Sequence, residues 1–147
     1  MMSPLTKRVA VGAAIAALVA FTQASYGEKR TSIRLNPAAF EFAQQLIREG
    51  RVVPDRKGGW AEHKPSRSAE GEFVRTHGLA EYAKWHLGID DRHAENTKSR
   101  YKFPFGDFVN IHRCGLLAVK SRAHEFGYAD IEAAAERLLA EIKNPKR

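Results

Sequence analysis

The chain has 147 residues, of which 44% are hydrophobic and 28% charged, and this is the composition of one ordinary folded domain. It carries 24 basic and 17 acidic residues, so the formal net charge of +7 favours anionic partners. The single cysteine, Cys114, excludes an internal disulfide and a multi-cysteine zinc site within one chain.

Residues 1–30 differ in character from the rest of the chain. Two basic residues precede an apolar run over 9–21, and Thr22 and Ala24 offer small residues before a cut at Ser25. This pattern is typical of a secretory signal peptide or, uncleaved, of a short anchor, because the run is shorter than the ~20 residues of a membrane span. A mis-assigned start and a genuine cytosolic extension are the alternatives. The first interpretation predicts a periplasmic or membrane-tethered protein, and a mis-assigned start predicts a cytoplasmic one.

The first helices are marked by their end signals. Asn36 is a good N-cap before an apolar arc of helical spacing, and Gly50 suits the left-handed residue that ends such a helix. A second helix is expected to begin near Ser66 or Ser68 and to end at Gly78.

Three more helices are predicted in the second half. One covers 79–88, a long one covers 108–126 with Asp107 as its cap, and the last covers 130–143 with Asp130 as its cap.

The pattern therefore predicts a mainly α fold, a small single-domain bundle of about four to five helices over 31–143. No alternating run is long enough to indicate a sheet. An aromatic-rich loop precedes the longest helix, and its Tyr101, Phe103 and Phe105 are expected to fold back as a clamp. Residues 144–147 form a basic tail.

His112 and Cys114 are the chemically interesting residues of the long helix. A half-buried imidazole can act as acid, base or ligand, although more often it only hydrogen-bonds within the fold. Cys114 is expected on the opposite, more polar side, so a base for it would have to come from a distant histidine. A zinc or iron site assembled in three dimensions stays open, but no histidine pair has the spacing of one. No catalytic residue, metal ligand or cofactor is assigned.

A basic and aromatic surface is predicted around the loop and the outer side of the long helix. Such a surface suits a protein or another anionic partner, and nucleic acid is the less favoured choice. The predicted partner-binding residues are Tyr101, Lys102, Phe103, Arg113, Lys120 and His124.

Arg122 is expected near the apolar seam of the long helix. A buried arginine there would need a carboxylate, for which Asp107, Asp130 or Glu132 are available.

The stretches "KFPFGDF" and "HRCG" carry a resemblance that extends over about 32–139. The chain resembles a group of short uncharacterised bacterial proteins with no established function. Those proteins generally lack a leader, which favours the mis-assigned start. The resemblance implies no activity, cofactor or catalytic residue.

Two functions follow as hypotheses. The first is a non-enzymatic interaction module that binds a protein or anionic partner through the basic and aromatic surface. The alternative is a small metal-binding protein or enzyme with a site around His112.

Overall fold

The computed structural model describes residues 32–143. The leader hypotheses for 1–30 and the predicted tail over 144–147 therefore fall outside the described residues. Within the described part, none of the helices is long and apolar enough to cross a membrane.

Residues 32–143 form a mixed α/β fold with six α-helices and two small sheets, which corrects the predicted mainly α bundle. The helices are α1 (Pro37–Arg48), α2 (Trp60–His63), α3 (Arg67–His77), α4 (Leu79–Ala83), α5 (Arg113–Phe126) and α6 (Ala129–Lys143), with a 3-10 turn at Lys98–Arg100. The strands are β1 (Ile33–Leu35), β2 (Val52–Val53), β3 (His86–Asp90), β4 (Tyr101–Pro104) and β5 (Ile111–His112).

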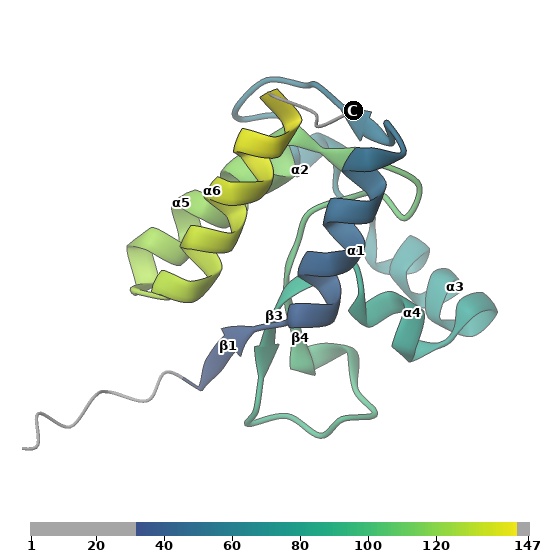
Figure 1. The fold of residues 1–147 in the computed structure, drawn as a ribbon. Helices are drawn as coiled ribbons and strands as arrows, with labels where there is room; N and C mark the ends of the chain where they lie inside the picture. The colour runs from purple at the N-terminus through teal and green to yellow at the C-terminus, as the bar shows by residue number, and fades with distance from the viewer. Residues whose placement is uncertain (1–31, 144–147) are drawn as a thin grey trace, which may run out of the picture.

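The larger sheet has the order β1-β3-β4, and both pairings are antiparallel. The second sheet is the short parallel pair of β2 and β5, in which Val53 lies opposite His112. In Figure 1, α1 crosses the middle of the molecule, with the α5–α6 pair on one side and α3 and α4 on the other.

The end signals of α1 and α3 are confirmed. The side chain of Asn36 accepts from the backbone of Ala39, and Gly50 adopts a positive φ of 71° just beyond the helix. Ser66 caps α3 through the backbone N–H of Ala69, and the helix ends before Gly78.

The predicted helix over 79–88 is wrong in its second half. The helix stops at Ala83, and the chain continues as β3, the central strand of the larger sheet. Four of the five β3 residues are buried, so the strand lacks the alternation that would reveal it in the sequence. Gly88 is needed there, because a Cβ would lie 2.7 Å from the ring of Phe103.

The predicted helix over 108–126 begins too early. Phe108 has a positive φ of 70°, which a right-handed helix does not allow, and α5 starts only at Arg113. Asp107 caps a tight turn, since its Oδ1 accepts from the N–H groups of Val109 at 2.9 Å and Asn110 at 2.7 Å. The predicted stop at the end of α5 is confirmed by Gly127, which is left-handed.

The core lies between α1, α5, α6 and the larger sheet. Leu46 from α1, Leu116 from α5 and Leu138 from α6 are fully buried in it, and Leu87 and Phe105 complete its centre. Segment 54–66 lies outside this core and is attached to it at the start of α5, where the functional site is found.

Candidate metal centre

Four side chains with metal-binding atoms meet where β2, α2, β5 and α5 come together. Asp55 follows β2, His63 ends α2, His112 ends β5, and Cys114 lies in the first turn of α5. One ligand atom from each lies within 4.8 Å of all the others. The parallel β2–β5 pairing causes part of this convergence, because it fixes the start of the Asp55 loop beside His112.

The Oδ2 atom of Asp55 lies at the point where the other three groups converge. It is 2.7 Å from Nδ1 of His112, 2.8 Å from Nδ1 of His63 and 3.1 Å from Sγ of Cys114. The carboxylate is held in this orientation because its Oδ1 accepts from the backbone N–H of Cys114 at 2.6 Å. Four side chains with metal-binding atoms therefore face one another around this carboxylate oxygen.

One donor–donor distance in the cluster matches tetrahedral zinc, and the three distances to Asp55 are shorter. Ligands at about 2.0–2.3 Å from a zinc ion lie about 3.3–3.8 Å from one another. The distance from Sγ of Cys114 to Nδ1 of His63 is 3.5 Å. The shorter contacts of Asp55 are hydrogen bonds, so the carboxylate would have to move outward to admit an ion among the four groups.

A second carboxylate orients His112. Its Nε2 lies 2.9 Å from Oδ2 of Asp107, so both ring nitrogens face a carboxylate. A histidine that binds a metal through one nitrogen commonly donates its other N–H to a carboxylate, which fixes the tautomer and the ring. Trp60 covers the ring with its centroid 6.1 Å away.

The negative charges that the Asp55 carboxylate and a Cys114 thiolate would bring together favour a bound cation. Burial alone would raise the pKa of Asp55, but the backbone N–H of Cys114 and the side chains of His112 and Cys114 lower it to about 2. Burial, followed by the neighbouring Asp55, raises the pKa of Cys114 to about 12. A thiolate beside that carboxylate is therefore unfavourable until a divalent cation compensates both charges.

The burial of Cys114 and its raised pKa argue against a cysteine nucleophile. Nucleophilic cysteines need a lowered pKa and access to substrate. The Cys114 side chain is 1% exposed, its thiol donates to Asp55, and burial raises its pKa. The chemistry that fits this arrangement is ligation of a metal.

Burial would likewise lower the pKa of His112, but hydrogen bonds to Asp107 and Asp55 outweigh it and raise the pKa. Each ring nitrogen of His112 faces one carboxylate oxygen, Nδ1 that of Asp55 and Nε2 that of Asp107. A metal ion at Nδ1 takes the place of one proton in the same geometry.

Sequence reasoning identified two members of this centre and missed the other two. His112 was expected to be half-buried and is buried. Cys114 was expected on the polar side of the helix and is also buried in the centre. Asp55 and His63 were not singled out. The available signal was the local grouping of Asp55 and His63 in one short loop, eight residues apart.

The six predicted partner-binding residues do not form one surface. Lys102 and Phe103 line a cavity beside β4, whereas Lys120 and His124 line a separate hollow facing α6. There Lys120 pairs with Glu136 and His124 with Glu132, both at 3.0 Å.

Arg113 lines a further hollow together with Lys120 and Glu136, whereas Tyr101 lines none of these hollows. The Tyr101 hydroxyl donates to the carbonyl of Glu95 at 3.4 Å. Arg113 donates to the carbonyl of Asp55 at 3.3 Å and so contributes to the loop of the metal centre. Their role in binding a partner stays a prediction.

The predicted burial of Arg122 is wrong. Its side chain is 65% exposed, its ion-pair partner is Glu125 at 3.5 Å, and it covers the ring of Phe126. Arg122 lines a surface cavity instead of the apolar seam.

In comparisons with protein-family models, curated proteins and solved structures, nothing matched this chain.

Proposed function

We propose that this protein is a non-enzymatic metal-binding module that holds one divalent transition-metal ion, with Zn²⁺ as the ion its ligands suit best. The ligands are Asp55, His63, His112 and Cys114. The observation that carries the proposal is the convergence of three donor atoms on Oδ2 of Asp55, with Asp107 hydrogen-bonded to the far nitrogen of His112.

The donor set supports zinc among the common ions. Two imidazole nitrogens, one thiolate and one carboxylate make a mixed set that Zn²⁺ accepts, whereas Mg²⁺ and Ca²⁺ prefer oxygen alone. Thiolate and carboxylate together balance the charge of a divalent ion. Four protein ligands leave no open position, which is typical of a structural site rather than a catalytic one.

The role that follows is to fasten segment 54–66 to the body of the fold. Asp55 and His63 bracket most of this segment, and the other two ligands belong to β5 and α5. Between them Trp60 packs on the start of α5, where a Cβ on Gly115 would lie 3.0 Å from its ring. An ion bound only by the folded chain stabilises this packing by an amount that grows with the logarithm of its concentration over its Kd.

The test is metal analysis of protein purified without a histidine tag. We expect close to one zinc per chain, a higher Tm with zinc than with EDTA, and visible bands of a tetrahedral thiolate site after exchange with Co²⁺. A local readout is tryptic cleavage after the exposed Arg56 and Lys57, which should be slow with zinc and fast with EDTA.

The chain provides a matched pair of control variants. His63 and His93 have side chains that are 39% and 42% exposed, but only His63 belongs to the centre. We expect His63→Asn to weaken zinc binding by more than the about 100-fold that loss of an outer partner can cost, while His93→Asn leaves it unchanged. Substoichiometric metal together with a Tm indifferent to zinc and EDTA would refute the proposal.

The predicted interaction module is compatible with such a site and remains a second candidate. A specific observation favours it, namely that Lys102 and Phe103 line a cavity of about 590 Å³.

A further inference from the structure

A cavity of about 590 Å³ opens between β4, α2 and α5. It lies next to the metal centre and shares Trp60 with it, but none of the four ligands lines it. Its volume lies in the range of about 300–1,000 Å³ that is usual for small-molecule sites.

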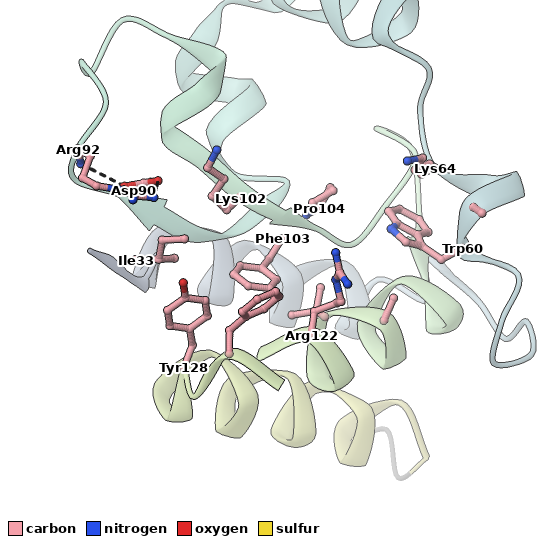
Figure 2. Close-up of a pocket in the computed structure, with 14 residues that line it drawn as sticks. Ile33, Trp60, Lys64, Asp90, Arg92, Lys102, Phe103, Pro104, Arg122 and Tyr128 are labelled. Atoms are coloured by element: carbon pink, nitrogen blue, oxygen red, sulfur yellow. Dashed lines mark hydrogen bonds and ion pairs between the residues drawn. The ribbon is translucent and has the colours of Figure 1, made fainter. Parts of the chain in front are cut away.

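The walls of the cavity are mostly apolar and strongly aromatic. Trp60 forms one end, Phe103 and Tyr128 form the other, and Phe126 borders it from the end of α5. Figure 2 shows the rings of Phe103 and Tyr128 on one side, Trp60 on the other, and Arg122 between them. Phe126 is 54% exposed, which is unusual for a phenylalanine beside a concave apolar surface.

The charges at the cavity are unbalanced toward positive. Asp90 is the acidic residue of the lining, and Arg92 already neutralises it through a contact of 2.8 Å. Among residues 32–143, no carboxylate lies within ion-pair distance of the Lys64 ammonium. Arg122 has only the exposed Glu125 at 3.5 Å, and such surface pairs hold a guanidinium weakly.

We propose that this cavity binds a small molecule with an apolar, aromatic-sized body and one carboxylate. The body would lie between the rings of Trp60, Phe103 and Tyr128. The carboxylate would pair with Arg122, whose guanidinium can accept it in a bidentate manner, and with Lys64. This inference goes beyond the metal centre and does not depend on it.

The experiment uses two probes that differ only in charge, 4-phenylbutyrate and its neutral amide, titrated into the protein as purified. Binding is followed by NMR through the indole N–H of Trp60, and the N–H of the buried Trp85, which does not line the cavity, serves as internal reference. We expect saturable shifts of the Trp60 signal and binding of the acid at least about tenfold tighter than the amide.

Three variants complete the test. The double variant Lys64→Gln/Arg122→Gln should abolish the preference for the acid and keep weak binding of the amide. Arg75→Gln removes an arginine that is 73% exposed, against 65% for Arg122, and is likewise paired at i,i+3; it should change neither the preference for the acid nor the binding of the amide. Ala118→Phe should fill the cavity and remove binding of both probes.

No saturable shift of the Trp60 signal in the wild type would overturn the proposal. Equal affinities for acid and amide, or a preference that survives in the double variant, would overturn it as well. These outcomes are measured on the wild type and on the double variant, so they do not depend on whether Ala118→Phe folds. The double variant should fold, because both of its changes are at exposed positions.

Discussion

The side chain of Asp107 lies 2.9 Å from Nε2 of His112, on the side of the ring opposite to Nδ1, the atom proposed to bind the metal. The same carboxylate closes the turn that leads into β5 through its other oxygen. Asp107 therefore sets the direction in which His112 meets the other ligands.

Asp107→Asn should weaken zinc binding by about 10- to 100-fold, because an amide nitrogen facing Nε2–H cannot accept its hydrogen bond. The amide oxygen can still close the turn, so the fold should survive. Competition with a chromogenic chelator measures the affinity. Asp91→Asn, at an exposed carboxylate that pairs with Arg34, is the control and should bind zinc like the wild type. An unchanged affinity in Asp107→Asn would show that the contact does not orient a ligand.

Asn36 does more than cap α1. Its side-chain nitrogen donates to the carbonyls of Ala83 at 3.0 Å and His86 at 3.1 Å, while its oxygen accepts from Ala39. Asn36→Asp keeps the cap but places a carboxylate oxygen against two carbonyls. It should therefore lower the free energy of unfolding by about 2 kcal/mol or more, as Asn36→Ala should. Urea denaturation at neutral pH measures both. If Asn36→Asp is as stable as the wild type, only the cap matters.

His86 gives the protein a pH dependence that is separate from the metal centre. Burial lowers the pKa of His86 to about 4, against an ordinary value of 6.5, and the backbone carbonyl of Tyr82 accepts from its Nδ1 at 2.8 Å. The rings of Tyr82 and Tyr101 flank the imidazole. Because the unfolded chain takes up the proton first, stability is complete above pH 6.5 and falls by about 3 kcal/mol as the pH drops to 4.

Replacement of His86 by Asn tests this window, because the amide can still donate to Tyr82 but does not titrate. The wild type should be more stable than His86→Asn at pH 7, and this advantage should shrink by about 3 kcal/mol between pH 6.5 and 4. Urea midpoints across the range report the difference, in which acid effects common to both proteins cancel. The carboxyls of Asp55 and Asp90, with pKa values of about 2, lose most of their contribution below pH 4, and the part lost above it is common to both proteins. A constant difference from pH 7 to 4 would mean that folding does not lower the pKa of His86.

Helix ends were readable from the sequence because their signals are local. Asn36, Ser66 and Gly127 each act within three or four residues of their own position, and the structure confirms all three. The strands were not readable. β2 and β5 contain two residues each, and β3 is buried over most of its length, so neither periodicity nor alternation could mark them.

The metal centre was missed for a related reason. Asp55 and His112 are 57 residues apart, and the parallel pairing that joins their strands leaves no trace in the sequence. The predicted helix over 108–126 contained both His112 and Cys114, and residues two positions apart in a helix point to different faces. In the structure His112 ends a strand and Cys114 lies in the first helical turn, so the boundary between them turns both toward Asp55.

Phe108 shows how packing can outweigh backbone preference. It has a φ of 70°, a region that costs about 1–3 kcal/mol for a non-glycine residue. Its ring stacks on Phe73 of α3 with centroids 4.2 Å apart and meets Trp85 edge-on at 5.9 Å. The stacked rings therefore hold the turn before β5 in its strained shape and connect it to α3.

Two substitutions separate these effects. Phe108→Ala removes the ring and keeps the strain, whereas Phe108→Gly removes both. We therefore expect Phe108→Gly to be less destabilising than Phe108→Ala by about 1 kcal/mol, which reverses the usual order of the two residues. The free energies of unfolding of both variants should be measured in urea beside Val109→Ala and Val109→Gly, a neighbouring pair with an exposed side chain and no positive φ. If glycine is the worse residue at both positions, the positive φ of Phe108 carries no strain.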